Sequence, residues 1–435
     1  MVSNPNPHQI EQLQQENVRL RKAVEELSVL NDIAVAISST LSLDKIVELI
    51  VQKCVKHFRA EQGAVMLLEH GDQGNAFHTM VRKMDSSVSF LPYRLDTQIT
   101  GWMLKHQKPL LVNDFDKDER FQKIGESDWP VLAMLCVPLL LKGKMIGVLS
   151  VFNKRSREEF TLEDQRLLSI IAAQSAQVIE NARLYKEEQA YLRMQEEMRL
   201  ARDIQQNLLP KAPPEIPGYQ IAGKSVPAKD VGGDFFDYIF MDENRIALCL
   251  GDVSGKGMPA AMLMANIQAT LRAQTLPGLS CKKCIERSNQ LLFQSTDPQK
   301  FATLFYGFLD KTNHRFQYCN AGHDNPLLFS GDKEPTRLGT GGIVLGFVPY
   351  FPFEEAKISL QPDDVLLLYS DGITEAMNAK GEEFGEDRLA TVVKNHRNQA
   401  PEKIIEEILQ NVKAHIGNEP QMDDMTLMVI KRVKE

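Results

Sequence analysis

The spacing of hydrophobic and polar positions changes several times along this chain, and each change marks a predicted element. Residues 10–30 carry a stripe at heptad spacing with one Asn among apolar side chains: Ile10, Leu13, Asn17, Leu20, Val24 and Leu27. Such a stripe predicts a short coiled coil, and Asn at an inner position favours parallel pairing of two strands. An amphipathic leader that packs on its own domain is the alternative.

Residues 31–185 combine helical periodicity with short apolar runs that are typical of strands. The pattern predicts a helix at residues 43–58 and a strand at 64–68. Two longer apolar runs, 131–141 and 145–152, are separated only by a Lys-Gly-Lys turn, which predicts a β-hairpin. This segment should therefore form an α+β domain.

A long helix is expected next, because Thr161 and Asp164 have the spacing of a capping box. Its first stripe has heptad spacing: Leu168, Ile171, Ser175, Val178, Ala182, Tyr185, Gln189 and Leu192. After Leu192 the stripe is offset and continues as Met198, Ala201, Gln205 and Leu208. A phase change of this kind can make two packings close in energy. Prolines from Pro210 onward end the helix.

These patterns divide the chain into four predicted parts. We expect a coiled coil at residues 1–32, a sensor-like domain at 33–185, a signalling helix at 186–212 and a second α+β domain at 213–435.

Composition narrows the possible classes of protein. The 435 residues are 43% hydrophobic and 25% charged, as in ordinary globular domains. The net charge of −8 disfavours a nucleic-acid partner, since phosphates would be repelled. The chain has no run of about 20 apolar residues and no apparent signal peptide, so we expect a cytoplasmic protein without a membrane partner. Cys281 and Cys284 are interpreted as ordinary helix residues.

Acidic residues at the ends of apolar runs form the candidate chemistry of the second domain. Asp234, Asp252, Asp371 and Asp423 lie in the motifs GGDFFD, GDVSGKG, YSDGITEA and DDMTL. Hard divalent cations take oxygen ligands of this kind. Any single Asp-Gly pair is more simply a turn, and a phosphate-binding Walker loop at 251–257 is excluded by its spacing. The ordered set favours a metal site.

The same motifs, with ATLFYG at 302–307, NAGHDNP at 320–326 and LGTGGIVLG at 338–346, resemble the SpoIIE/RsbU-type branch of the metal-dependent protein phosphatase 2C superfamily. The resemblance implies an αββα β-sandwich that binds two Mn²⁺ or Mg²⁺ ions and hydrolyses phosphoserine or phosphothreonine. It implies that Asp252 bridges both ions and that Asp234 and the Val253 carbonyl join one of them. Asp371 and Asp423 would hold the other.

Some neighbours of these residues are expected to support the site rather than bind metal: Gly233, Asp237, Gly372 and Asp424. Asp424 could instead be an exposed neighbour of Asp423, and Asp237 could be structural. His323 is interpreted as a loop-shaping residue, since metal-activated hydrolysis needs no protein nucleophile. Lys256 could contact a substrate phosphate or be a solvated loop lysine.

Residues 99–103, 109–114, 136–139 and 147–154 resemble a GAF domain, a small-ligand or interaction module, whose ligand the sequence leaves open. The resulting hypothesis is a dimeric phosphatase under GAF control. By resemblance, its expected substrate is a phosphorylated STAS-type anti-sigma-factor antagonist in a partner-switching pathway. The alternatives are an inactive phosphatase fold that sequesters a partner and a coiled-coil scaffold.

Overall fold

The computed structural model describes residues 11–17, 20, 24, 42–68, 77–84, 97–115, 117–121, 131–276, 278–297 and 300–434. The chain divides into two compact units, Met1–Leu192 and Arg193–Glu435. Most of the heptad segment at residues 10–30 lies outside the described residues. Those of its residues that are described are helical, and Leu13, Leu20 and Val24 are 62%, 60% and 63% exposed.

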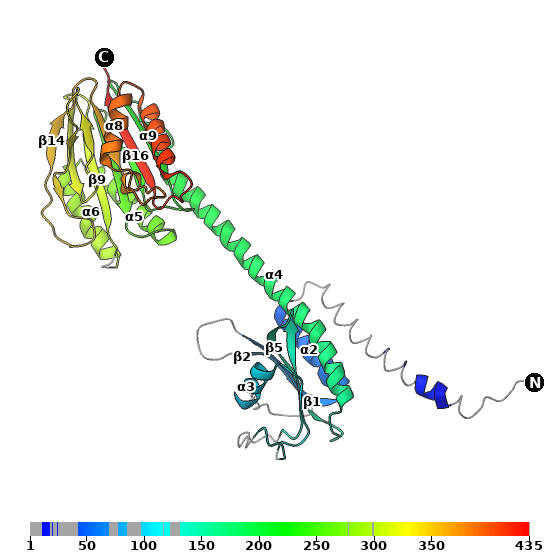
Figure 1. Ribbon diagram of the computed structural model, residues 1–435. Helices are drawn as coiled ribbons and strands as arrows, with labels where there is room; N and C mark the ends of the chain where they lie inside the picture. The colour runs from blue at the N-terminus through cyan, green and yellow to red at the C-terminus, as the bar shows by residue number, and fades with distance from the viewer. Residues whose placement is uncertain are drawn as a thin grey trace, which may run out of the picture. The chain divides into compact units, whose positions relative to one another are not determined.

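The first unit is built on a five-stranded antiparallel sheet in the order β2-β1-β5-β4-β3 (Figure 1). Its elements before the long helix are α2 (Leu43–His57), β1 (Ala60–Leu68), β2 (Phe77–Met84), α3 (Thr97–His106), β3 (Leu110–Val112), β4 (Met134–Leu141) and β5 (Lys144–Lys154). The predicted hairpin is confirmed as β4 and β5, although β4 begins three residues later than the apolar run suggests.

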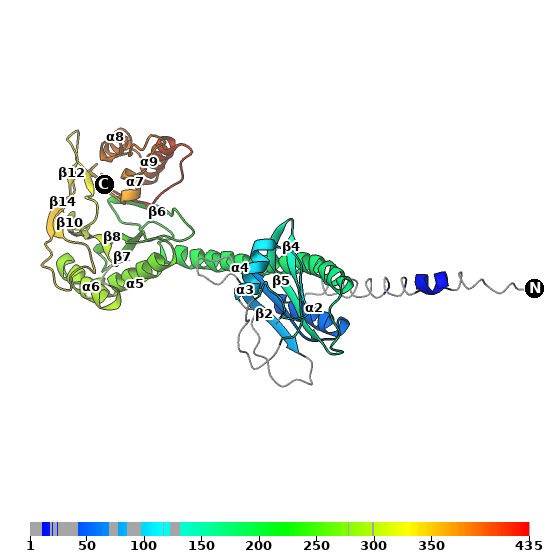
Figure 2. The same cartoon turned by 60° about the horizontal axis from the view of Figure 1, so that its bottom comes forward.

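Alternation along the strands gives this sheet two apolar faces. Leu135 and Val137 of β4 pack with α2 and the first part of α4 (Leu162–Leu208), whereas Met134 and Cys136 pack with α3. Figure 2 shows α2 and α4 together beside the strands. The predicted cap of α4 is confirmed, because Asp164 N–H donates to Thr161 Oγ1 (3.1 Å) and Thr161 N–H donates to Asp164 Oδ2 (2.8 Å).

The heptad interpretation of the first part of α4 is wrong. Leu168, Ile171 and Ser175 are fully buried, and Val178 nearly so, inside their own unit. They cannot also face a partner helix, because side chains buried in one close-packed core have no free surface. The offset stripe lies in the part of α4 that belongs to the second unit, and its residues are half-buried there: Met198, Ala201, Gln205 and Leu208. Gln205 donates to the Gly232 carbonyl, and the Leu208 carbonyl accepts from Gln268.

In the second unit, the residues that the structure describes form two sheets and five further helices. The strands are β6 (Tyr219–Val226), β7 (Phe235–Phe240), β8 (Arg245–Val253), β9 (Ala302–Asp310), β10 (Arg315–Ala321), β11 (Leu327–Phe329), β12 (Thr336–Arg337), β13 (Gly341–Gly342), β14 (Ala356–Ser359), β15 (Val365–Tyr369) and β16 (Met425–Arg432). The helices are α5 (Met258–Thr275), α6 (Cys281–Ser295), α7 (Asp371–Thr374), α8 (Glu386–His396) and α9 (Pro401–Ile416).

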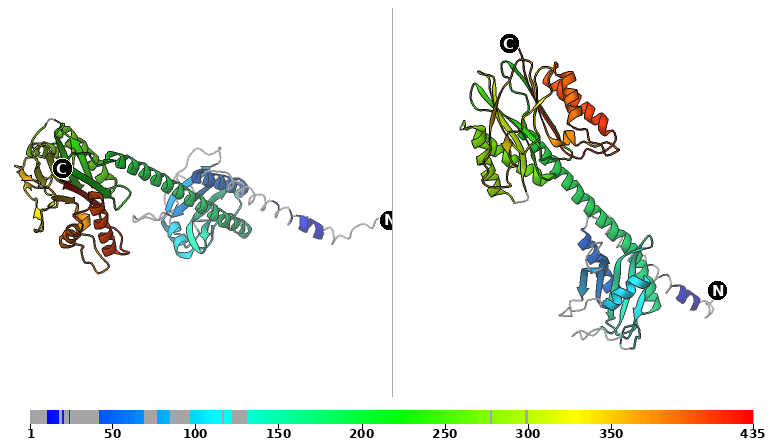
Figure 3. Two further views of the ribbon diagram at one scale, coloured as in Figure 1. Left: turned by 90° about the horizontal axis from the view of Figure 1, so that it is seen from above. Right: turned by 60° about the vertical axis from the view of Figure 1, so that its left-hand side comes forward.

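The two sheets face each other across an apolar core. One sheet has the order β13-β10-β9-β8-β7, with β14 also on β10, and the other has the order β12-β11-β15-β16-β6. Between them pack Phe236, Leu250, Phe305, Leu368 and Met428. Helices α5 and α6 cover the outer face of the first sheet, and α8 and α9 cover the second (Figure 3). This arrangement confirms the predicted αββα sandwich.

The two cysteines of the CxxC pair, Cys281 and Cys284, are buried on α6 and are part of the apolar core there. Their interpretation as ordinary helix residues is therefore confirmed. No helix in the described ranges is both long enough and apolar enough to cross a membrane.

Candidate active site

The four candidate aspartates lie at strand ends, two on each sheet. Asp234 immediately precedes β7, and the antiparallel register of β7 and β8, in which Phe235 pairs with Gly251, brings Asp234 opposite Asp252. On the other sheet, Asp371 directly follows Ser370 at the end of β15, and Asp423 precedes β16 by two residues. Antiparallel pairing of β15 with β16 brings these two ends together.

Asp424 holds the two sheets together at this rim. Its side chain is buried, and its carboxylate accepts backbone N–H bonds from Ala228 (2.8 Å), Gly233 (2.8 Å) and Asp234 (3.3 Å). Its own carbonyl accepts from the Ser370 hydroxyl (3.2 Å). The alternative of an exposed neighbour is therefore wrong: Asp424 anchors the loop that carries Asp234. The doubled Asp of DDMTL is the one local signal of this role.

Glycines permit close backbone contact around these carboxylates. A Cβ on Gly233 would lie 2.7 Å from the Val253 carbonyl oxygen, and one on Gly372 would lie 2.1 Å from the Asp424 carbonyl oxygen. Any side chain at either position would push the strand ends apart. The two glycines expected to support the site thus do so sterically, and Gly233 lies directly against the carbonyl that the resemblance assigns to a metal.

The carboxyl groups lie in one another's electric field. Burial, and then the charge of Asp371, raises the pKa of Asp252 to about 6. Burial, and then Asp252, raises the pKa of Asp234 well above its ordinary value, and burial with Asp423 raises that of Asp371. Cations would remove this repulsion.

The donor set fits hard divalent cations. The Oδ2 atom of Asp234 is buried and has no hydrogen-bond partner, which is costly for a carboxylate unless a cation or proton satisfies it. All the oxygen donors are carboxylates or a backbone carbonyl, as Mg²⁺ and Mn²⁺ prefer. In the described part of the chain, no three acidic, His or Cys side chains converge tightly enough to form a ready-made metal cage.

Asp423 already has a cationic partner. The ammonium of Lys256, from the loop after β8, lies 2.8 Å from Asp423 Oδ2 and donates to the Met422 carbonyl (2.7 Å). Lys256 is therefore neither a freely solvated loop residue nor placed for a substrate in this structure. The sequence singled out both residues but could not show their contact, because they are distant along the chain.

Asp237 is buried away from this rim, on the face of β7 that contacts α5. Its carboxylate accepts from Arg272 Nε (2.6 Å) and Nη2 (3.0 Å) and from Gln268 Nε2 (3.1 Å). Gln268 also donates to the Leu208 carbonyl near the end of α4 (2.9 Å). Asp237 is therefore a structural anchor between α5 and α4, as its structural interpretation suggested.

Two residues of the NAGHDNP loop lie beside the site. His323 Nδ1 is 2.7 Å from the hydroxyl of Thr303, the residue paired with Asp252 across β8 and β9. Burial lowers the pKa of His323 to about 4, so the imidazole is neutral and fits a loop-shaping role. Burial, and then Asp371, raises the pKa of Asp324 to about 6, which marks it as a neighbour the sequence reasoning overlooked.

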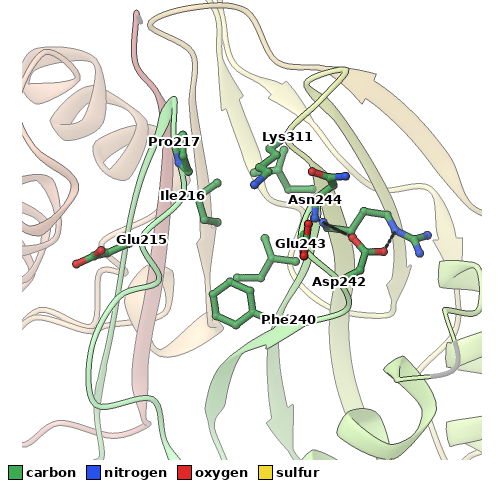
Figure 4. Close-up of a pocket in the computed structure, with 11 residues that line it drawn as sticks. Glu215, Ile216, Pro217, Phe240, Asp242, Glu243, Asn244 and Lys311 are labelled. Atoms are coloured by element: carbon green, nitrogen blue, oxygen red, sulfur yellow. Dashed lines mark hydrogen bonds and ion pairs between the residues drawn. The ribbon is translucent and has the colours of Figure 1, made fainter.

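The cavity in Figure 4 is not this site. It has a volume of about 50 Å³ and lies at the other end of β7, between Ile216, Phe240 and Lys311. There Asp242 accepts from Arg245 Nε (2.7 Å) and closes the β7–β8 turn.

Comparison with known proteins finds two family models that match separate parts of the chain. Residues 242–433 match the family model of stage II sporulation protein E (SpoIIE), and residues 40–180 match a GAF-domain model. Protein IcfG of Synechocystis sp. is 31% identical over 264 residues, which cover 54% of this chain and 41% of IcfG. Phosphoserine phosphatase RsbU of Bacillus subtilis is 29% identical over 260 residues, covering 57% of this chain and 75% of RsbU.

Among solved structures, the SiaA-PP2C domain of Pseudomonas aeruginosa aligns with 56% of this chain and 98% of that domain, at 19% identity and a TM-score of 0.49. The PP2C phosphatase domain of SpoIIE from Bacillus subtilis aligns with 49% and 63% of the two chains, at 21% identity and a TM-score of 0.44. The family-model matches show a GAF domain followed by a SpoIIE domain along the chain.

Proposed function

We propose that this chain is a metal-dependent protein serine/threonine phosphatase regulated by its GAF domain. The observation that carries the proposal is the meeting of Asp234, Asp252, Asp371 and Asp423 at one rim of the sandwich. The pKa values of the first three are raised, and one oxygen of Asp234 is buried without a partner. The likeness to RsbU, a phosphoserine phosphatase by name, supports the same class of reaction.

In this proposal Asp234, Asp252 and the Val253 carbonyl hold one divalent cation, and Asp252, Asp371 and Asp423 hold a second. Bound cations of this kind supply a water of lowered pKa as the nucleophile and offset negative charge on the phosphoryl group. The protein's part is positioning: Asp424 fixes the Asp234 loop, and Ser370 ties the start of α7 to β16 through its hydroxyl, which accepts from Thr426 N–H (3.0 Å).

The expected substrate is a phosphorylated STAS-type anti-sigma-factor antagonist, which would place the enzyme in a partner-switching pathway. Support comes from the family resemblance and from RsbU among the relatives. The chain spans only 41% of the length of IcfG. The competing hypothesis is an inactive phosphatase fold that binds a phosphoprotein without hydrolysing it.

The decisive experiment is phosphate release from p-nitrophenyl phosphate by the full chain. With Mn²⁺ or Mg²⁺ present we expect turnover, with EDTA none, and with excess metal added back full recovery. A phosphoserine-bearing STAS protein should be dephosphorylated under the same conditions. Stable binding of that phosphoprotein without phosphate release, at any metal concentration, would favour the binding module and refute the enzyme.

The proposal includes a homodimer. The exposed apolar residues Leu13, Leu20 and Val24 have the spacing of a coiled-coil seam, and Leu192 is 49% exposed beyond the buried part of α4. Light scattering of the full chain at micromolar concentration should give twice the monomer mass, and removal of residues 1–32 should weaken the dimer. The exposed Leu162, on α4 but off the stripe, provides the control: Leu192→Asp should weaken the dimer further and Leu162→Asp should not. A monomeric mass for the intact chain would contradict this part.

A further inference from the structure

A lysine in the loop between β8 and α5, Lys256, contacts Asp423, one of the expected metal ligands. Lys256 lies between Gly255 and Gly257, whose φ angles of +98° and +77° are in the region that favours glycine. This backbone path directs Lys256 across to the segment before β16, where its ammonium contacts the Asp423 carboxylate at 2.8 Å and the Met422 carbonyl at 2.7 Å.

The electrostatic surroundings keep this ammonium charged. The ammonium donates to Asp423 Oδ2, and the carboxylates of Asp424 and Asp371 add negative charge nearby. Both side chains of the pair are 44% exposed, so the contact is one that water and salt can compete with. This ion pair can therefore form in the empty site and still be displaced by a divalent cation.

A divalent cation and an ammonium compete for the same carboxylate oxygen. A metal at Asp423 would sit about 2 Å from an oxygen whose other side now contacts Lys256, and two cations that close repel strongly. The other carboxylate oxygen, Oδ1, already accepts from Asp424 N–H (2.9 Å). A cation that binds Asp423 through Oδ2 would therefore compete with Lys256 for that oxygen.

We infer that Lys256 is a resident counter-ion for the second metal position: it holds Asp423 while that position is empty and must leave when a divalent cation binds there. This inference rests on the proposed function. Lys256 then has a positioning role toward the metal. It weakens metal affinity at Asp423, and in the empty site its charge offsets the repulsion between the carboxylates.

The test is direct binding of Mn²⁺ to the full chain, measured by isothermal titration calorimetry in the absence of substrate. Lys256→Met retains the length of the side chain and removes its charge, and we expect its weaker Mn²⁺ site to bind roughly three- to fivefold tighter, the range for loss of a half-exposed ion pair. Lys256→Arg keeps the charge and should remain within about twofold of wild type on the same scale.

Lys300→Met is the matched control. The Lys300 ammonium lies 3.3 Å from the position that a Cβ on Gly255 would take, so it flanks the same loop without touching Asp423. If Lys300→Met tightens Mn²⁺ binding as much as Lys256→Met, the effect is a general change of charge and the inference is wrong. Unchanged or weaker Mn²⁺ binding by Lys256→Met would also overturn it.

The outcomes separate this inference from the proposed function. A wild-type chain that binds no Mn²⁺ would refute the metal-dependent phosphatase itself. Wild-type binding with no response to Lys256→Met would refute only the counter-ion role. The Mn²⁺ concentration for half-maximal phosphate release should fall in Lys256→Met by the same factor as the dissociation constant, since the lysine acts before substrate enters.

Discussion

Asp252→Asn should reduce Mn²⁺-dependent phosphate release by at least about 10³-fold and at the same time stabilise the metal-free protein. The loss of activity follows because Asp252 is the residue expected to contact both cations, and the loss of a shared ligand removes the charge stabilisation that metal catalysis provides. The gain in stability follows from the carboxylate repulsion already present in the folded chain.

The sign of that gain comes from proton linkage. The pKa of Asp252 is raised from 3.8 to about 6 by burial and by Asp371, so the folded chain binds its proton more tightly than the unfolded chain does. Stability from this group is greatest below pH 4 and is lost as the pH rises through about 6. At pH 7 the ionised carboxylate costs about 1–3 kcal/mol, which Asn removes.

Urea unfolding in EDTA at pH 7 measures the gain, and p-nitrophenyl phosphate hydrolysis in Mn²⁺ measures the loss. Asp242→Asn is the matched control, because Asp242 lies in the turn at the far end of the same β7–β8 hairpin, and it should leave activity unchanged. Added Mn²⁺ should stabilise the wild type but much less the Asp252→Asn variant. Wild-type turnover in Asp252→Asn would remove it from the ligand set.

The elements that carry the site could be predicted because their signals are local. The apolar runs before Asp252 and Asp371 are strands, the hairpin of the first unit forms across its Lys-Gly-Lys turn, and the Thr161 cap starts α4. Each of these depends on residues within a few positions of one another, where periodicity and capping decide the structure.

What the sequence could not supply are contacts between distant segments. Asp424 and Gly233 are 191 positions apart, and nothing local to either shows that the carboxylate anchors that loop. The stripe from Leu168 to Val178 failed for a related reason. A heptad pattern shows which face of a helix is apolar but not whether a partner helix or the chain's own sheet covers it, and here it is the sheet and α2.

The second stripe of α4 contacts the loop that carries Asp234, and we propose that it transmits regulation by the GAF domain. Gln205 Nε2 donates to the Gly232 carbonyl (2.7 Å) and its Oε1 accepts from Gly232 N–H (3.0 Å), so one side chain holds both polar groups of that residue. Arg202 Nε also donates to the Asp230 carbonyl (3.0 Å). Gly232 is two residues before Asp234, so movement of this part of α4 would move a residue that we propose binds metal.

Gln205→Leu should therefore reduce phosphate release about tenfold at subsaturating Mn²⁺, because loss of both hydrogen bonds lets Asp234 shift, and small displacements of a catalytic group are expensive. Gln206→Leu, on the exposed neighbouring position, is the control and should match wild type. The cost in stability should be only about 1 kcal/mol, because water can reach Gly232 when the amide is gone.

An insertion series after Glu197 asks whether this contact transmits a signal. Three added residues rotate the upstream helix by most of a turn relative to Gln205, whereas seven add nearly two whole turns and restore the phase. Activity of the full chain should change with three and return with seven, and the dependence should disappear when Gln205→Leu is also present. A profile that stays flat in the wild-type background would mean that α4 only tethers the two domains, whereas a phase dependence that survives Gln205→Leu would place the coupling at another contact of the helix.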